Sequence, residues 1–292
     1  MPKKAKSTWN EEFDDDAYKL SRLEFAAKFV STIDPRGWPH ITFIAFNRAI
    51  AKDKLVWGQF TEGKSKKYVK ENPRQGIAMM TAEMPFKFIQ TKVKFTHLSK
   101  EGEDLDYFSR MDLLRYNTYM NAHTAYYNDV IAVTPVRLLG LGGIVKGIIA
   151  NMIGVGALRD KNAEKKLPVL PFELFNGPIN PKFLSWIDED GYPIIIPCFQ
   201  LRAPDRGKLS FTLSQFGEEL KKIPLGAHIS AFAMNMEMEN IMVNGRLVEW
   251  KKKRGVNFAT IDIDEVYNSM PPLPGLIYPT LDSRPKVTSF KL

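Results

Sequence analysis

A short polar segment near residue 60 contains the residue types that bind phosphate. The sequence WGQFTEGKSKKYVKENPR, residues 57–74, has the pattern of a strand end, a glycine turn at Gly63 and a helix start. Basic and hydroxyl side chains follow the turn directly: Lys64, Ser65, Lys66 and Lys67. Backbone N–H groups at a helix N-terminus, together with ammonium and hydroxyl donors, suit a phosphate dianion. The same residues could instead form a solvated basic turn, and their charges alone do not choose between the two.

Other residues that could carry chemistry lack the spacing of known sites. The four histidines have no metal-type spacing: His40, His97, His123 and His228. Cys198 is the only cysteine and follows the apolar run IIIP, so we expect a buried, inert thiol. No P-loop, dinucleotide-binding fingerprint or Ser/His/Asp order occurs. The sequence therefore predicts no metal centre.

The composition is typical of a soluble globular protein. Hydrophobic residues make up 44% of the chain and charged residues 25%. The net charge of +8 is spread over small clusters of Lys and Arg, which argues against a nucleic-acid partner. With a single cysteine and no recognisable leader segment, a cytoplasmic location is the default expectation.

The chain contains an internal repeat. FVSTIDPRGWPHI, starting at Phe29, returns as FLSWIDEDGYPII, starting at Phe183, and the same shift of 154 residues places KLVWGQ over KLSFTL without a gap. A period this long predicts tandem domains, because solenoid repeats are much shorter. Within each copy, short β-rich runs separated by turn residues predict a closed or partly closed antiparallel barrel.

These patterns divide the chain into four parts. We predict a first barrel over residues 20–137, an apolar and glycine-rich linker over 138–178, a second barrel over 179–270 and a tail over 271–292. Residues 10–29 begin acidic and become basic, which favours a helix. The apolar stretch 138–158 is long enough to cross a bilayer, but Lys146 near its middle and its glycines argue against it. It could pack against the barrels, form a dimer surface or contact a membrane.

The order of motifs around the basic segment resembles the pyridoxamine 5′-phosphate oxidase-like superfamily of FMN-binding split β-barrels. The motifs are D-x-x-G-x-P, L-x-W-x-Q, G-K-S-K-K and N-P-R, followed by a strand near Gln90. The resemblance implies a mainly β fold with helices, in which two tandem split β-barrels form an intramolecular pseudo-dimer. It also implies FMN as the cofactor, with cofactor-binding roles for these residues: Thr42, Trp57, Gly58, Gln59, Lys64, Ser65, Lys66 and Gln90.

Departures from the family pattern narrow the expected activity. Gln59 stands where threonine is usual, and Thr42 stands where oxidase members place a cofactor-contacting arginine. No C-terminal Arg/His cluster of the kind that holds the vitamin phosphate is present. The resemblance therefore implies FMN binding but not vitamin B6 oxidation.

The second copy has lost the phosphate-binding residues. The shift of 154 places Glu218 over Lys64 and Glu219 over Ser65, and carboxylates repel a phosphate dianion. We expect the second barrel to serve only as the opposing wall of the flavin site. The candidate wall residues are Asn240, Asn244 and Arg246.

These observations predict a flavoprotein that oxidises or reduces an unidentified small molecule. A non-catalytic split-barrel protein that binds haem, a deazaflavin or another planar ligand is the alternative, and an interaction module that docks through the linker is a third possibility. We expect no nucleic-acid partner, and a membrane contact is the least favoured of the three roles open to the apolar stretch. The chain is expected to be a monomer with paired barrels or a homodimer, and no catalytic residue is assigned.

Overall fold

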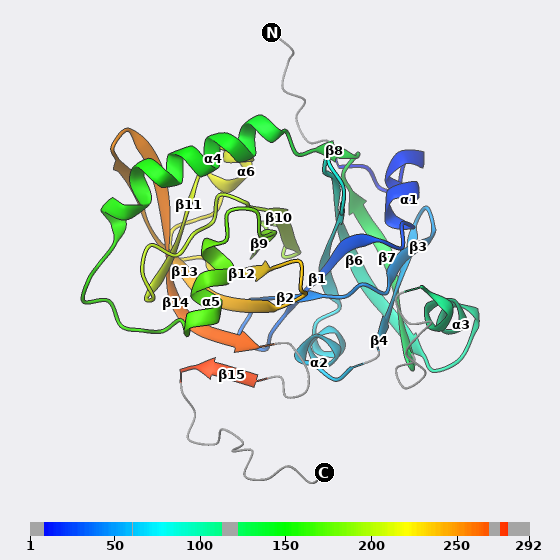
Figure 1. The fold of residues 1–292 in the computed structure, drawn as a ribbon. Helices are drawn as coiled ribbons and strands as arrows, with labels where there is room; N and C mark the ends of the chain where they lie inside the picture. The colour runs from blue at the N-terminus through cyan, green and yellow to red at the C-terminus, as the bar shows by residue number, and fades with distance from the viewer. Residues whose placement is uncertain (1–8, 60, 113–121, 269–274, 280–292) are drawn as a thin grey trace.

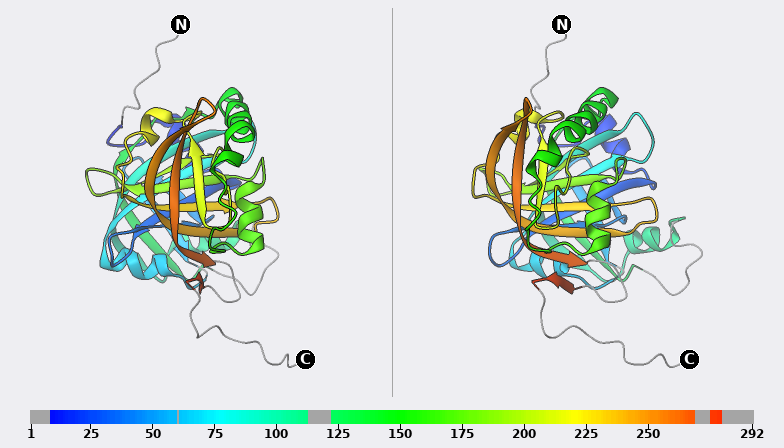
Figure 2. Two further views of the ribbon diagram at one scale, coloured as in Figure 1. Left: turned by 90° about the vertical axis from the view of Figure 1, so that its left-hand side faces the viewer. Right: turned by 60° about the vertical axis from the view of Figure 1, so that its left-hand side comes forward.

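The protein folds into two antiparallel β-sheets that lie side by side, one built from each half of the chain (Figure 1). The computed structural model describes residues 9–59, 61–112, 122–268 and 275–279. Helices lie on the outside of the two sheets, and the long helix α4 (Leu141–Gly154) runs beside the second sheet (Figure 2).

The first sheet has eight strands in the order β2-β1-β5-β6-β7-β4-β3, and β8 pairs with β6. Its strands are β1 (Ala26–Ile33), β2 (Pro39–Phe43), β3 (Asn47–Ala51), β4 (Lys54–Gln59), β5 (Arg74–Thr81), β6 (Lys87–Ser99), β7 (Thr124–Val133) and β8 (Arg137–Leu138). The helices of this half are α1 (Asp15–Ser21), α2 (Lys64–Glu71) and α3 (Glu103–Arg110).

The second sheet has seven strands in the order β10-β9-β12-β13-β14-β11, and β15 pairs with β14. Its strands are β9 (Lys182–Ile187), β10 (Pro193–Pro197), β11 (Lys208–Thr212), β12 (His228–Met234), β13 (Asn240–Lys253), β14 (Val256–Asn268) and β15 (Gly275–Tyr278). The helical segments are α4, the 3-10 helix η1 (Val155–Leu158), α5 (Val169–Asn176) and α6 (Gly217–Leu220).

The two sheets share one topology, which confirms the predicted duplication. Each begins with a hairpin, and equivalent strands occupy equivalent places in the two orders. The register agrees as well, because Ile33 faces Pro39 in the first hairpin and Ile187 faces Pro193 in the second. Both hairpin turns end on a glycine with positive φ, 82° at Gly37 and 79° at Gly191, which explains why glycine recurs there.

Each barrel has its own apolar core, and a third apolar cluster joins them. The rings of Phe29 and Phe183, which are equivalent residues, lie 4.0 Å apart between centroids. The hydroxyl oxygens of Ser31 and Ser185, also equivalent, are 2.8 Å apart and hydrogen-bonded. Equivalent residues that contact each other lie next to a local two-fold axis. The two barrels therefore form the pseudo-dimer predicted from the sequence.

A buried lysine occupies the same place in both barrels. Lys28 donates to the carbonyl oxygens of Ser21 and Asn47, and its equivalent Lys182 donates to the carbonyl oxygen of Gly177. Burial lowers the pKa of Lys28 to about 8 and lowers that of Lys182 well below its usual value. Both ammonium groups donate to backbone carbonyl oxygens, so their role is structural.

The segment between the barrels is helical and packs on the second barrel. Asn151 of α4 donates to the carbonyl oxygen of Gln200, and Gly147 and Gly154 are buried against the same barrel. Among the described residues, no helix is both long enough and apolar enough to cross a membrane.

Two elements differ from the sequence-based expectations. The helix expected over residues 10–29 is confined to α1, because the chain from Ala26 onward joins the first sheet by pairing with β5. The expected tail over 271–292 contains the strand β15, which pairs with the edge of β14, while residues 271–274 and 280–292 of that tail lie outside the described residues.

The closest backbone contact between the barrels is at Gly76 in β5. A Cβ atom at this position would lie 2.1 Å from the carbonyl oxygen of Pro193 in β10. The equivalent residue in the second barrel is Ser230, whose hydroxyl accepts a hydrogen bond from the backbone N–H of Ile41. The contact at Gly76 thus requires a residue without a side chain, whereas the equivalent contact at Ser230 is a side-chain hydrogen bond.

We expect Gly76→Ala to destabilise the protein by about 1–3 kcal/mol, because the added methyl group forces the barrels apart. Thermal unfolding of the variant measures the loss. Gly142→Ala is the matched control, since a Cβ atom at Gly142 meets nothing within 4 Å. Equal unfolding temperatures for the two variants would contradict a tight contact at Gly76.

Candidate functional site

The N-terminus of α2 is the start of the candidate site. The helix begins directly after Gly63, without a side-chain cap and without an acidic residue in its first turn. Its first turn carries Lys64 and Lys66, although cations are unfavourable at this end of a helix dipole. Uncapped N–H groups next to cations are suited to an anion, as the sequence predicted.

The hydroxyl donors predicted for this site come together in the structure. The oxygens of Thr42 on β2 and Ser65 on α2 lie 2.6 Å apart, and the Ser65 side chain is 1% exposed. Thr42 and Ser65 belong to different elements, a strand and a helix. The fold of the first barrel brings the two hydroxyl groups together. The two hydroxyl groups add neutral donors to the charges of the first turn.

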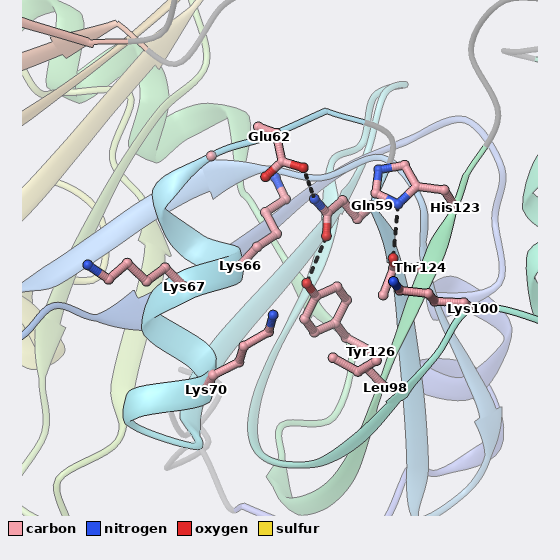
Figure 3. Close-up of a pocket in the computed structure, with 11 residues that line it drawn as sticks. Gln59, Glu62, Lys66, Lys67, Lys70, Leu98, Lys100, His123, Thr124 and Tyr126 are labelled. Carbon is pink, nitrogen blue, oxygen red and sulfur yellow. Dashed lines mark hydrogen bonds between the residues drawn. The ribbon is translucent and has the colours of Figure 1, made fainter.

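The two lysines of the first turn point to different flanks of α2. The Lys64 ammonium lies 4.4 Å from the centroid of the Tyr267 ring, toward the second barrel. Lys66 is buried and points toward Glu62 (Figure 3). Burial lowers the pKa of Lys66 to about 8, and the Glu62 carboxylate partly offsets this effect. Lys66 therefore stays largely charged at neutral pH and loses its charge as the pH rises through about 8.

A cavity of about 370 Å³ opens beside Lys66. It is lined by Gln59, Glu62, Gly63, Lys66, Lys67, Lys70, Leu98, Lys100, His123, Thr124 and Tyr126 (Figure 3). The lining includes four lysines against one carboxylate, and all of it comes from the first half of the chain. Its volume lies within the usual range for small-molecule sites. The cavity thus combines space for a ligand with a strong preference for negative charge.

Gln59 connects the end of β4 to the cavity wall. Its side-chain oxygen accepts a hydrogen bond from the Tyr126 hydroxyl at 2.7 Å, and its side-chain nitrogen donates to Glu62 at 3.2 Å. Burial raises the pKa of Tyr126 to about 12, so its hydroxyl remains a donor at neutral pH. Gln59 thus fixes the orientation of an aromatic ring that faces the cavity.

Trp57 and Gly58 do not line the cavity. Trp57 is fully buried in the first barrel, where it stacks on Tyr126 at 4.0 Å and donates to Gln75. Gly58 lies under α3, because a Cβ atom there would be 2.9 Å from the Phe108 ring. Trp57 acts on the cavity only through Tyr126, and Gly58 allows α3 to approach the strand.

The two barrels meet along two seams, one on each side of the local two-fold axis. Gln90 lies at the seam that is away from the first turn of α2. Its side chain donates to the carbonyl oxygen of Ile195 at 2.8 Å and accepts from Arg137 at 3.2 Å. Arg137 also forms a bidentate ion pair with Glu219, the residue equivalent to Ser65. A protein cation thus neutralises the carboxylate at the degenerate site. Sequence comparison missed Arg137, because it follows β7, beyond the part of the repeat that aligns without a gap.

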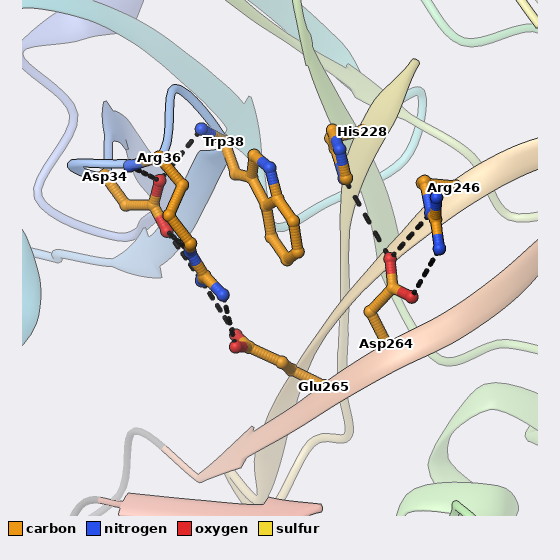
Figure 4. Close-up of polar contacts among 7 residues, drawn as sticks. All are labelled: Asp34, Arg36, Trp38, His228, Arg246, Asp264 and Glu265. Carbon is orange, nitrogen blue, oxygen red and sulfur yellow. Dashed lines mark hydrogen bonds and ion pairs between the residues drawn. The ribbon is translucent and has the colours of Figure 1, made fainter. Parts of the chain in front are cut away.

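Side chains from both barrels meet at the seam beside Lys64 (Figure 4). Arg36 in the first hairpin turn pairs with Asp34 and with Glu265 of β14. The neighbouring Trp38 ring stacks on His228 at 3.9 Å between centroids. These contacts close the seam with protein side chains. The cavity beside Lys66 lies in the first barrel, whereas the sequence analysis placed the flavin site between the barrels, with the second barrel as its opposing wall.

The candidate wall residues have their own contacts in the second barrel. Arg246 pairs with Asp264, and the side-chain nitrogen of Asn240 donates to the carbonyl oxygen of Met238 (Figure 4). Asn244 is buried, and its side-chain oxygen has no hydrogen-bond partner among the described atoms. None of the three lines the cavity.

The histidines have separate environments. His40 is buried between the rings of Tyr68 and Tyr267, and burial lowers its pKa to about 3. His97 stacks on Tyr127, whereas His123 lines the cavity. Across the part of the chain that the structure describes, no group of His, Cys, Asp and Glu side chains could hold a metal ion.

Comparisons with known proteins point to one fold. No family model and no curated protein matches the sequence. Among solved structures, an FMN-binding protein from Syntrophomonas wolfei subsp. wolfei is 20% identical, with a TM-score of 0.36; the match covers 43% of this chain and 87% of that one. The chain resembles FMN-binding split-barrel proteins.

Two further matches are similarly partial. HupZ of Group A Streptococcus is 15% identical over 39% of this chain and 89% of its own, with a TM-score of 0.32. An F420 reductase is 10% identical over 41% of this chain and 94% of its own, also with a TM-score of 0.32. Two proteins described as candidate pyridoxamine 5′-phosphate oxidases are also among the matches, over 42% and 41% of this chain.

We expect sulfate to bind at the first turn of α2 with an affinity that falls as the pH rises above about 8. Sulfate remains a dianion throughout, whereas Lys66 has a lowered pKa of about 8 and must regain a proton to pair with it. The loss approaches tenfold per pH unit. Calorimetric titrations between pH 7 and pH 9.5 measure it.

Lys66→Arg is the control for this pH dependence, because a guanidinium group stays charged over the whole range. The arginine variant should bind sulfate with nearly constant affinity. A wild-type affinity that does not change with pH would show that Lys66 takes no part.

Proposed function

We propose that this protein binds FMN, with the phosphate at the first turn of α2 and the ring in the adjoining cavity. The observation that supports this proposal best is the first turn of α2. It has an uncapped helix start, the paired hydroxyl groups of Thr42 and Ser65, and the cations Lys64 and Lys66 on its two flanks. This donor set fits a terminal phosphate monoester, which FMN has. The cavity volume and the amide of Gln59 fit a planar heterocycle with polar edges.

The residues of the chain bind and orient the cofactor in this proposal. Lys64, Lys66 and the hydroxyl pair hold the phosphate, and the exposed Lys70 and Lys100 attract an anionic ligand to the cavity. Tyr126, held by Gln59, provides a rigid aromatic wall. The bound flavin would supply the redox chemistry, so we propose an oxidoreductase acting on a small molecule.

A planar ligand such as haem or a deazaflavin, bound without turnover, is the second candidate. The observation in its favour is His123, the histidine that lines the cavity, since haem requires an axial ligand. Haem does not need the phosphate-binding turn, whereas FMN does not need His123. The absorption spectrum of the purified protein distinguishes a flavin from a haem, and chromatography of the released ligand distinguishes FMN from a deazaflavin.

We expect Lys64→Met and Lys66→Met each to weaken FMN binding at least ~10-fold, because each removes a charge-assisted phosphate contact worth about 1.5–3 kcal/mol. The substitutions keep most of the side-chain volume, so the fold should persist. Quenching of flavin fluorescence measures the dissociation constant. Lys222→Met, which removes an exposed lysine on the second barrel, is the matched control. Unchanged affinity in both first-turn variants would place the phosphate elsewhere.

The asymmetry of the two barrels predicts one FMN per chain. At the second site Glu219 replaces Ser65 and Glu218 replaces Lys64, and the nearby Arg137 already pairs with Glu219. Titration of cofactor-free protein measures the stoichiometry. Saturation at two flavins per chain would show a functional second site. Saturation at one flavin per two chains would show that the site forms between molecules.

A further inference from the structure

Helix α4 packs small and polar residues, together with Ile144, against the rest of the protein and leaves two large apolar side chains half-exposed. Gly147, Asn151 and Gly154 face the second barrel and are buried. Val145 and Ile149 point outward and are 51% and 50% exposed. A helix on a protein surface normally buries its large apolar residues and exposes its polar ones.

Close packing explains the inward face of α4. A Cβ atom at Gly147 would lie 2.8 Å from Gln200 and Ser214, and one at Gly154 would lie 2.4 Å from the Phe258 ring. The helix therefore needs small residues toward the barrel. Packing does not explain why large apolar residues occupy the outward face, where alanine, lysine or glutamate would favour a helix equally well.

A basic cluster lies at one end of this apolar face. The tip of the β13–β14 hairpin carries Lys251, Lys252 and Arg254 as exposed residues. It adjoins the C-terminal end of α4, where a Cβ atom at Gly154 would lie 3.7 Å from the Lys253 carbonyl oxygen. Figures 1 and 2 show the hairpin tip beside the helix in each view. Lys146, also exposed, adds a charge on the helix itself.

We propose that α4 and the β13–β14 tip dock on an anionic lipid surface. The docking face consists of Val145, Lys146 and Ile149 on the helix, and Lys251, Lys252 and Arg254 on the hairpin. Apolar side chains that enter the interface between headgroups and acyl chains, flanked by basic residues that contact anionic headgroups, are the pattern of peripheral membrane binding. The proposed contact is peripheral, since no helix among the described residues is long and apolar enough to span a membrane.

The charges favour lipid over a second copy of the chain. A symmetric dimer through α4 would place the same basic residues of both copies close together, and like charges in an interface are unfavourable. An anionic lipid surface is complementary to all of them. The nearby acidic group Glu249 pairs with Lys251. This inference is independent of the proposed cofactor.

The test is co-sedimentation of the full chain with vesicles. We expect binding to vesicles of phosphatidylcholine with about one third phosphatidylserine, weaker binding at high salt, and little binding to phosphatidylcholine alone. Equal binding to both kinds of vesicle, or no binding to either, would overturn the proposal.

Two double variants separate the apolar and electrostatic contributions. Val145→Ser with Ile149→Ser, and Lys251→Glu with Lys252→Glu, should each reduce vesicle binding at least tenfold and leave thermal unfolding nearly unchanged. The matched controls are Leu225→Ser with Met236→Ser, at exposed apolar residues elsewhere on the second barrel, and Lys222→Glu. Binding that survives either docking-face variant would overturn the proposal. So would a solution dimer that the Val145/Ile149 variant disperses, since the face would then be a protein interface.

Discussion

The structure depends on the packing of two equivalent strands, β1 and β9, around a local two-fold axis. Phe29 meets Phe183 and Ser31 meets Ser185, so each residue contacts its own counterpart. A self-complementary contact of this kind is what a symmetric dimer uses, and here it occurs within one chain. Because the two halves are covalently linked, their surfaces could change independently while this central contact was kept.

The two seams on either side of the axis show that divergence. At one seam, the helix start of α2 carries cations and hydroxyls, and a cavity opens beside it in the first barrel. At the other, Glu219 replaces Ser65 and is neutralised by Arg137, which also bonds Gln90. The fold is therefore nearly symmetric, but its electrostatics are not. The proposal of a single anion-binding site rests on this difference.

The sequence motif in β4 does not reveal which of its side chains point into the cavity. Trp57, Gly58 and Gln59 are consecutive in β4, yet only Gln59 lines the cavity. Trp57 points into the barrel core, and Gly58 faces α3 on the other side of the sheet. Side chains alternate between the faces of a strand, so Gly58 lies on the opposite face from Trp57 and Gln59. Trp57 and Gln59 both contact Tyr126, but Trp57 is covered by its stack on that ring. Gln90 belongs to the other seam, where its side chain donates to the Ile195 carbonyl oxygen in β10.

The sequence by itself determined the duplication, the antiparallel strands and the basic helix start. These features depend on local periodicity, turn glycines such as Gly37 and Gly191, and residues that are close along the chain. Only the tertiary structure decided that Thr42 reaches Ser65, that Arg137 neutralises Glu219, and that residues from Ala26 onward leave their helical pattern to join a sheet. Each of these depends on which distant strands become neighbours, and no local pattern in a single sequence encodes that pairing.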